Sequence, residues 1–420
     1  MRPVLQSSKL GDVRYELRGD VPRAARELEA RGHRILNMNL GDPAPFGFAA
    51  PESIVLDVIH HLPQAQGYSE SKGLFSARTA VAQHYQNRGL QNVQVDDVFI
   101  GNGVSELIPM TLQALLENGD EVLVPSPDFP LWTAAVGLAG GVPRHYLCNP
   151  DQRWYPDLED IENKINPKTR GIVIINPNNP TGAVYPEHVL AGIVALARKH
   201  DLVLFSDEIY EKVIFEGDHF HTAALAEDLC CVTFSGLSKA YRMPGYRSGW
   251  FVLTGPRSAT ASYREGLELL ASLRLCANVP AQHAIQTALG GHQSIEDLVA
   301  PAGKLRVQRD LAHELLNDIP GLSCSPANGA MYLFVRIDPE YYDFVSDEAY
   351  ALDLLHDQKL LIAHGSAFNW FGEQYFRFVF LPPAAEIADA ARRIRAFLQS
   401  RRRVPQDAAP VASEPKQNIV

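Results

Sequence analysis

The feature that most constrains the fold of this chain is a repeated alternation of short apolar runs and segments with helical periodicity. The runs are rich in β-branched residues and contain few polar positions, which is typical of strands buried on both faces. Helical spacing of apolar residues lies between them, as in 105–116, 131–138 and 186–200. This order predicts an α/β fold built on a mainly parallel sheet with helices on both faces. The apolar runs are 98–100, 122–124, 172–175, 202–205, 232–234 and 250–253.

The length and the order of elements predict two domains and two terminal segments. A chain of 420 residues exceeds the usual size of a single hydrophobic core. We expect an N-terminal arm (1–48) that packs with the small domain, a large domain (49–290), a small α+β domain (291–400) and a disordered tail (401–420). The tail carries an arginine triplet, three prolines and few apolar residues, which favours disorder.

Charge and cysteine usage exclude several classes of protein. Lysines and arginines number 38 against 49 acidic residues, giving a net charge of −11 without a basic stripe, which argues against nucleic acid or membrane as a partner. The five cysteines form no C-x-x-C and no His/Cys ligand spacing, so we expect reduced thiols in a cytoplasmic protein and no metal site. No apolar stretch is long enough for a signal sequence or a membrane span.

Polar residues follow nearly every predicted strand. In a parallel sheet, ligands bind outside the carboxyl ends of the strands, in the loops that come next. We therefore expect one binding site that draws on all of these loops. The segments are 101–105, 125–129, 176–182, 206–210 and 235–239.

Three of these loops suggest particular chemistry, although each also has an ordinary structural explanation. The glycine-rich loop before Ser105 opens a helix and suits a phosphate, but taken alone it is more often a plain helix cap, and Glu106 excludes a dinucleotide fingerprint. Asp207 ends a buried strand, where a carboxylate needs a cation or hydrogen bonds, yet it could simply cap the next helix. Lys239 follows small residues and could be a desolvated nucleophile or a solvated lysine at a strand end.

Taken together, these side chains describe one cofactor. A phosphate cradle, a carboxylate for a protonated ring nitrogen and a nucleophilic lysine fit pyridoxal phosphate bound as a Schiff base. Tyr210 and Asn179 could bond the ring oxygen, and Phe129 could stack on the ring. The parts occur after different strands, so their joint presence is a stronger signal than any one of them.

Three motifs carry a resemblance to a known family: Asn176–Gly182 (NPNNPTG), Asp207–Tyr210 (DEIY), and Ser235–Lys239 (SGLSK) with Arg247. They resemble the class I/II aminotransferases of pyridoxal phosphate fold type I, over about residues 5 to 398. The resemblance implies a large domain with a mainly parallel seven-stranded sheet sandwiched by helices, a small α+β domain, and a homodimer that shares its active sites. The segments 40–47, 101–107 and 272–283 are most similar to bacterial members that transaminate alanine.

The resemblance also implies roles for individual residues. Lys239 would bind the cofactor covalently and then move the substrate's α-proton, while Asp207 would keep the ring nitrogen protonated. Tyr210 and Asn179 would bond the ring hydroxyl, and Phe129 would stack on the ring. The phosphate would be held by Val104, Ser105, Ser235, Ser238 and Arg247, with Tyr68 reaching the phosphate of the neighbouring subunit's site.

Substrate binding is expected to depend on an arginine, because a planar guanidinium can pair with a carboxylate through two hydrogen bonds. Arg377 matches the family's position for this contact, and Gly41 and Asn179 would complete the pocket. Tyr15 and Arg18, on the arm, would contact the substrate side chain.

The reaction implied is transamination by a ping-pong mechanism, with L-alanine and 2-oxoglutarate giving pyruvate and L-glutamate. An aminotransferase with aromatic, branched-chain or methionine preference remains an alternative, as does a β-lyase on the same fold. A transcription regulator that borrowed the fold would need a DNA-binding module, and the arm before Gly41 is too short and not basic enough for one.

Overall fold

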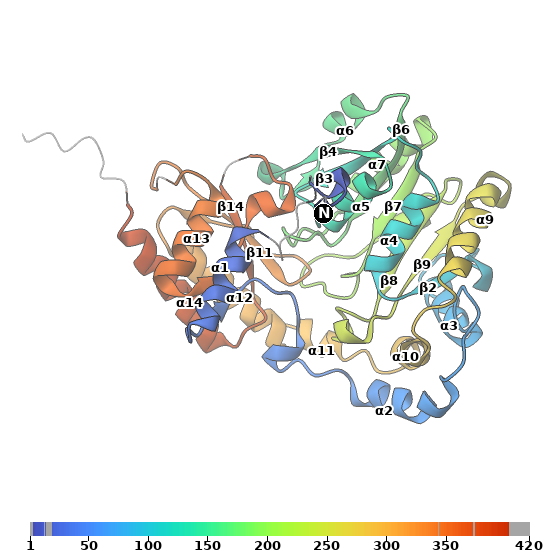
Figure 1. Cartoon of the computed structure of the whole chain (residues 1–420), viewed down its shortest axis with the longest axis horizontal. Coiled ribbons are helices and arrows are strands. Elements are labelled where there is room, and N and C mark those ends of the chain that lie inside the picture. Colours follow the sequence, from blue (N-terminus) through green and yellow to red (C-terminus); the bar gives the residue numbers. More distant parts are fainter. Residues whose placement is uncertain (1–2, 12, 14–18, 343, 373, 403–420) are drawn as a thin grey trace, which may run out of the picture.

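The structure is a computed structural model that describes all residues except 1–2, 12, 14–18, 343, 373 and 403–420. Two sheets from different parts of the sequence dominate it, a large one near the middle of the chain and a small one near its end (Figure 1). The expectation of a disordered tail concerns residues that lie almost wholly outside the described part.

The large sheet contains eight strands in the order β2-β9-β8-β7-β6-β3-β4-β5. Neighbouring pairs from β8 through β4 run parallel, whereas β9 and β5 run antiparallel to their neighbours. The prediction of a mainly parallel sheet is therefore confirmed. The strands are β2 (Val98–Gly101), β3 (Glu121–Ser126), β4 (Val142–Asn149), β5 (Tyr155–Pro156), β6 (Thr169–Ile175), β7 (Val203–Asp207), β8 (Cys231–Gly236) and β9 (Gly249–Thr254).

The resemblance implies seven strands, and the apolar runs of the sequence mark six of the eight observed, because β4 and β5 do not look like buried strands. Much of β4 is exposed, since it lies near the edge of the sheet, and it includes Pro143 and Arg144. Its two-residue partner β5 then forms the edge. An apolar run cannot signal a strand of this kind, because only one side of it needs to be buried.

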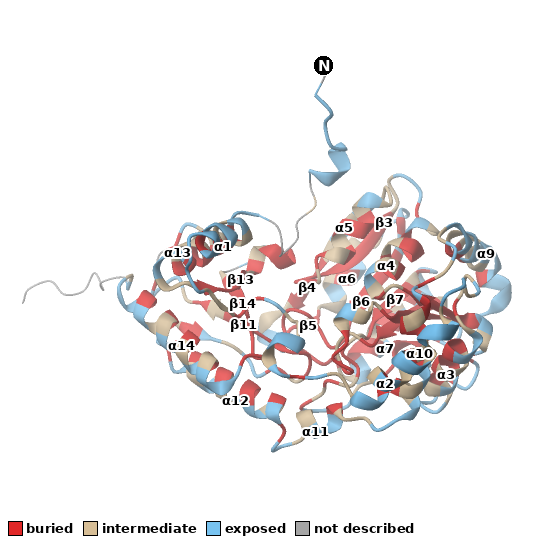
Figure 2. Cartoon of the chain, turned by 60° about the horizontal axis from the view of Figure 1, so that its bottom comes forward, coloured by how far each residue is buried: buried red, intermediate tan, exposed pale blue. Residues whose placement is uncertain are grey.

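Each central strand serves two hydrophobic cores. Successive side chains of a strand point to opposite faces. Along β6, Ile172 and Ile174 join one core, and Val173 and Ile175 join the other. The second core includes helices α4 (Val104–Gln113), α5 (Leu131–Leu138) and α9 (Arg257–Leu273). The first includes α3 (Phe75–Gln86), α7 (Glu187–Lys199) and α10 (Val279–Gly290). Figure 2 shows the buried residues concentrated in the strands and on the inner sides of the helices.

The region 256–290 forms two helices. α9 ends at Leu273, and Leu275 has a φ of 71°, a left-handed conformation that stops a helix. The Asn278 side chain then accepts a hydrogen bond from the Ala281 amide and caps α10. Shorter helices complete this part of the chain: α2 (Glu52–His61), α6 (Leu158–Lys164), α8 (Thr222–Leu225) and α11 (Ile295–Val299).

The small sheet is antiparallel, in the order β10-β11-β14-β13, and packs with three helices. From the arm, α1 (Asp20–Ala30) packs on α13, and β1 (Leu36–Asn37) pairs in parallel with β12 (Leu360–Leu361). The remaining elements are β10 (Leu322–Ser323), β11 (Tyr332–Ile337), β13 (Ala363–His364), β14 (Tyr375–Val379), α12 (Lys304–Asn317), α13 (Asp347–Gln358) and α14 (Ala384–Gln399). Among the described helices, none has the length and apolar character needed to cross a membrane.

Candidate active site

A pocket of about 350 Å³ lies where the loops after the central strands meet the small sheet. Most of the predicted site residues line it, although they come from widely separated parts of the sequence. Because parallel strands end at the same edge of the sheet, the topology alone brings these loops together. The lining residues are Leu40, Gly41, Asp42, Val104, Ser105, Phe129, Ile175, Asn179, Asp207, Ile209, Tyr210, Ser238, Lys239, Pro244, Arg247 and Tyr332.

Lys239 lies in the loop after β8 and extends into this pocket. Its Nζ donates a hydrogen bond to the Gly41 carbonyl oxygen at 2.8 Å and lies 5.6 Å from the centre of the Tyr210 ring. A single hydrogen bond to a neutral acceptor leaves two further donor positions on the ammonium group. The lysine is thus anchored but not neutralised by a carboxylate at bonding distance, which suits a nucleophilic amine.

Asp207 is the last residue of β7 and is almost fully buried. Its carboxylate accepts hydrogen bonds from Trp132 Nε1 at 3.0 Å and from the Ile209 amide at 3.3 Å. Burial nevertheless raises the pKa of Asp207 from 3.8 to about 6. A protonated ring nitrogen bound beside it would relieve this penalty, because an adjacent cation favours the ionised form of a carboxyl.

Tyr210 and Asn179 lie next to the lysine, and each has a second partner from the small sheet or its surroundings. Tyr210 Oη lies 2.6 Å from Tyr332 Oη, and burial raises the pKa of Tyr210 well above its ordinary value. Asn179 Oδ1 accepts a hydrogen bond from Arg377 Nη1 at 3.0 Å. Tyr210 and Asn179, the two side chains that could bond a ring oxygen, are therefore held in place by Tyr332 and Arg377 of the small sheet.

The opposite end of the pocket is suited to a phosphate. The first turn of α4 presents Val104 and Ser105, and Arg247 Nη2 donates to Ser105 Oγ at 2.7 Å. Gly103 has a φ of 81°, and a Cβ there would lie 2.3 Å from Arg247 Nη2. A helix N-terminus beside a guanidinium binds anions through backbone amides and charge. This cradle exists only because residue 103 has no side chain.

Ser235 does not take the position predicted for it. Its Oγ donates to Glu211 Oε1 at 3.1 Å, and the residue is absent from the pocket lining, whereas Ser238 lines the pocket. Ser235 still belongs to β8, where alternate side chains face opposite sides of the sheet, and its side chain faces the side away from the pocket. The expectation that its hydroxyl contacts the phosphate is not supported by this geometry.

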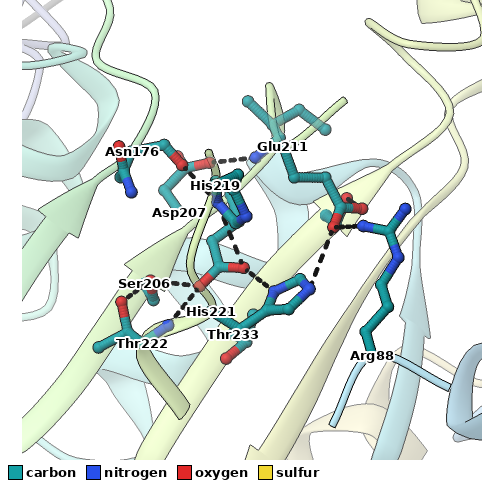
Figure 3. Close-up of polar contacts among 12 residues, drawn as sticks. Arg88, Asn176, Ser206, Asp207, Glu211, His219, His221, Thr222 and Thr233 are labelled. Carbon is teal, nitrogen blue, oxygen red and sulfur yellow. Dashed lines mark hydrogen bonds and ion pairs between the residues drawn. The ribbon is translucent and has the colours of Figure 1, made fainter. Parts of the chain in front are cut away.

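Through Glu211, Ser235 joins a buried polar network behind β7 and β8. Figure 3 shows other members of this network, among them Glu211, His221 and Arg88. His221 Nδ1 bonds Glu208 Oε2 at 2.5 Å, and Arg88 Nη1 pairs with Glu211 Oε2 at 3.2 Å. Burial lowers the pKa of His221, but its ion pair and hydrogen bond with Glu208 outweigh this effect and raise the pKa above its ordinary value.

Four side chains of this network, Glu208, Glu211, His219 and His221, are close enough to one another to contact one cation. A protonated His221 and Arg88 already balance the two carboxylates in charge, so the geometry is explained by ion pairing. We assign the network a structural role behind the pocket.

Arg377 lies on β14, opposite Phe334 of β11, and is almost fully buried. Besides Asn179, it donates from Nη2 to the Asn39 carbonyl oxygen. Its guanidinium lies 4.4 Å from the centre of the Tyr332 ring and 4.5 Å from that of Phe368. Arg377 is thus next to the pocket but behind Tyr332, which itself lines the cavity.

The remaining predicted residues have different placements. Phe129 and Gly41 line the pocket. Tyr68 is 81% exposed and lies outside the pocket of its own chain. Tyr15 and Arg18 lie outside the described residues.

Sequence reasoning missed Tyr332, Trp132 and Glu211. Tyr332 and Trp132 stand in apolar surroundings that indicate core residues, and the sequence contains no signal for the face that each one presents. Glu211 follows Tyr210 directly, but nothing in the sequence shows that Ser235 is its partner.

The comparisons with known proteins agree with this site. Residues 34–394 match the family model for aminotransferase class I and II, and the chain belongs to that family. Its members depend on pyridoxal 5′-phosphate. The residues present fit this cofactor on structural grounds: a lysine anchored beside the pocket, a buried carboxyl with a raised pKa, and an anion cradle that only a glycine permits.

Individual relatives are similar along almost the whole chain. An alanine aminotransferase of Mycobacterium bovis is 56% identical over 403 residues, covering 96% of this chain and 94% of the relative. The glutamate-pyruvate aminotransferase AlaA of Escherichia coli is 54% identical over 399 residues, covering 95% and 98%.

Solved structures show the same likeness. An aminotransferase from Escherichia coli has a TM-score of 0.94 at 53% identity, covering 96% of this chain and 100% of the other. An alanine aminotransferase from Pyrococcus furiosus has a TM-score of 0.90 at 35% identity, covering 94% and 100%.

Proposed function

We propose that this aminotransferase transfers the amino group of L-alanine to 2-oxoglutarate, giving pyruvate and L-glutamate in two half-reactions. The observation that carries the proposal is the convergence of Lys239, Asp207 and Arg247 on one pocket, in a chain more than half identical to relatives named for alanine and for glutamate and pyruvate. The bound cofactor supplies an electron sink for the pair of electrons released when the substrate's Cα–H bond breaks.

In this proposal, each pocket residue has a distinct task toward the cofactor. Lys239 would hold it covalently, and the Nζ of Lys239 would accept the substrate's α-proton. Asp207 pairs with the ring nitrogen, and Tyr210 and Asn179 donate to the ring oxygen. Phe129 packs on the ring. The phosphate is held by the amides of Val104 and Ser105, by Ser238 and by Arg247.

Arg377 is proposed to bind the substrate's α-carboxylate, assisted by Gly41 and Asn179. Its guanidinium is already oriented by Asn179 and by two aromatic rings. Because Arg377 comes from the small sheet and the cofactor-binding residues come from the large one, carboxylate binding would draw the two parts together and exclude water. We further propose that Tyr15 and Arg18 contact the substrate side chain.

We propose that the enzyme is a homodimer. The exposed position of Tyr68 fits a contact with the phosphate site of a second subunit. Helices α2, α3 and α9 lie on the part of the molecule away from the small sheet (Figure 1), and each carries exposed apolar side chains. Such side chains are expected at an interface between subunits. They include Leu56, Ile59, Phe75, Leu269 and Leu273. Sedimentation of the purified protein, before and after Leu273→Asp, tests this assembly.

We also propose that the protein resides in the cytoplasm. All five cysteines are free in the structure, as expected for a reducing compartment. Fractionation of cells that express the protein, followed by detection with an antibody, tests this location.

The substrate proposal is tested by mixing the purified enzyme with single amino acids and following the cofactor's visible absorption. Alanine and glutamate should each convert it from the lysine-bound form to the amine form, without a second substrate. A stronger response to aromatic, branched-chain or methionine substrates would assign the enzyme to another specificity group. Release of ammonia and a 2-oxo acid without an acceptor would indicate a β-lyase.

A further inference from the structure

Tyr332 is a pocket residue to which the proposed reaction assigns no task. It belongs to β11 of the small sheet, yet it lines the same cavity as Lys239 and Tyr210. Only 2% of it is exposed, so its position is fixed by its neighbours. Three contacts define what this side chain can do.

The first contact joins the hydroxyl groups of Tyr332 and Tyr210, whose oxygens are 2.6 Å apart. Each neutral phenol has one proton to donate and lone pairs with which to accept. If Tyr210 directs its proton to a ligand in the pocket, its oxygen remains open to the proton of Tyr332. Lys239, Asp207 and Arg377 are the charged groups that act on Tyr210 from the surrounding elements.

The second contact is made by the face of the Tyr332 ring. The guanidinium of Arg377 lies 4.4 Å from the ring centre, with Phe368 on a second side at 4.5 Å. A guanidinium next to an aromatic face is attracted to it and keeps its plane oriented. The ring and the hydroxyl of Tyr332 therefore touch different parts of the site.

The third contact is with Gly41. A Cβ at that position would lie 2.2 Å from Tyr332 Oη, so the backbone approaches the hydroxyl more closely than any other residue would permit. The same residue's carbonyl oxygen accepts the hydrogen bond from Lys239. Tyr332 therefore contacts Gly41, which anchors Lys239, as well as Tyr210 and Arg377.

We propose that Tyr332 is a positioning residue: its hydroxyl donates to Tyr210 and strengthens the bond from Tyr210 to the cofactor's ring oxygen, while its ring orients Arg377. This inference rests on the proposed function. Hydrogen bonds in a chain polarise one another, so a donor behind Tyr210 makes Tyr210 a better donor. The cofactor's ring oxygen is then more stable as an anion. It therefore attracts the proton on the Lys239 nitrogen less strongly.

Tyr332→Phe separates the two tasks, because phenylalanine keeps the ring and lacks the hydroxyl. Without the second donor, the ring oxygen becomes more basic, and the proton on the lysine-linked nitrogen is held about two- to fourfold more tightly. The pKa read from the cofactor's visible absorption should therefore rise. KM for alanine should change little. Tyr332→Leu also removes the ring and should raise KM for alanine about tenfold or more.

The experiment is an absorbance titration of the cofactor-loaded wild type, Tyr332→Phe, Tyr332→Leu and the control Tyr185→Phe, with KM and kcat measured on the same samples. Tyr185 is a fully buried tyrosine whose hydroxyl lies 3.8 Å from Cys148 Sγ, outside the pocket. Its loss should leave the absorbance pKa unchanged. The control therefore separates a specific effect from the general loss of a buried hydroxyl.

If Tyr332→Phe has the same absorbance pKa as the wild type, the hydroxyl does not act on the cofactor through Tyr210. If Tyr332→Leu has an unchanged KM for alanine, the ring does not orient Arg377. A wild-type enzyme whose absorption does not respond to alanine would instead refute the proposed function, and the inference with it. A responsive wild type with unaltered variants refutes the inference alone.

Discussion

Asp207→Asn should stabilise the cofactor-free protein, although it removes a group on which cofactor binding depends. Burial raises the pKa of Asp207 from 3.8 to about 6, so the folded chain binds this proton more tightly than the unfolded chain does. Folding is therefore not penalised by Asp207 at low pH, where the carboxyl is protonated in both states. The folded state loses stability as the pH rises from about 3.8 through about 6. At pH 8, the ionised Asp207 carboxylate therefore lowers the free energy of unfolding by ~3 kcal/mol.

Asparagine has nearly the same shape and does not ionise; its one oxygen can still accept the hydrogen bond from Trp132 Nε1, while the longer bond from the Ile209 amide is lost. The cofactor-free variant should therefore be more stable than wild type by up to ~3 kcal/mol at pH 8 and by about half of that at pH 5. With the cofactor bound, the order should reverse, because only the carboxylate can pair with a protonated ring nitrogen.

Urea unfolding of both proteins, with and without cofactor, at pH 5 and pH 8 measures these differences. Asp218→Asn serves as a control, because Asp218 is exposed and should show no such dependence on pH. If the two cofactor-free proteins are equally stable at pH 8, or if the advantage of Asp207→Asn does not shrink toward pH 5, then ionisation of the buried Asp207 does not destabilise the fold.

Three further substitutions test other parts of the site. Lys239→Ala should lower turnover by about 10²-fold or more by removing the proton acceptor, as measured by single-turnover absorbance; activity near wild type would exclude Lys239 from that role. Gly103→Ala should weaken cofactor binding at least tenfold, since its Cβ would meet Arg247, whereas Gly245→Ala has open space and should not; equal affinities would argue against the cradle. Glu211→Gln should destabilise the fold by ~3 kcal/mol in urea, unlike the exposed Glu227→Gln, because Arg88 and Ser235 lose a charged partner; an equal unfolding midpoint would show that the network adds no stability.

The central sheet could be predicted from the sequence because its strands are buried on both faces and therefore form continuous apolar runs. The strand β4, next to the edge strand β5, could not, since half of its side chains need not be apolar. The end of α9 could not be predicted either, for a different reason. Leu275 takes a left-handed conformation after α9, and no glycine or proline marks that position in the sequence.

The site was predictable to the extent that its residues stand directly after strands. Asp207, Asn179 and Lys239 can be located this way, and all three line the pocket. The direction of a side chain near the end of a strand is harder to predict: Ser235, in β8, bonds Glu211 and does not line the pocket. Tyr332 was missed because its role depends on a small-sheet strand that meets the large sheet only in three dimensions.

The pair Asp207 and Glu208 shows how one strand end can supply both the pocket and its support. Consecutive residues diverge there, so Asp207 borders the pocket and Glu208 bonds His221 in the buried network. An unpaired charge on Glu208 would disfavour ionisation of Asp207 through like-charge repulsion. His221, bonded to Glu208 at 2.5 Å, opposes that repulsion with its own positive charge. When His221 is protonated, its ion pair with Glu208 therefore limits the repulsion that Glu208 exerts on Asp207, although none of these residues needs to touch the ligand.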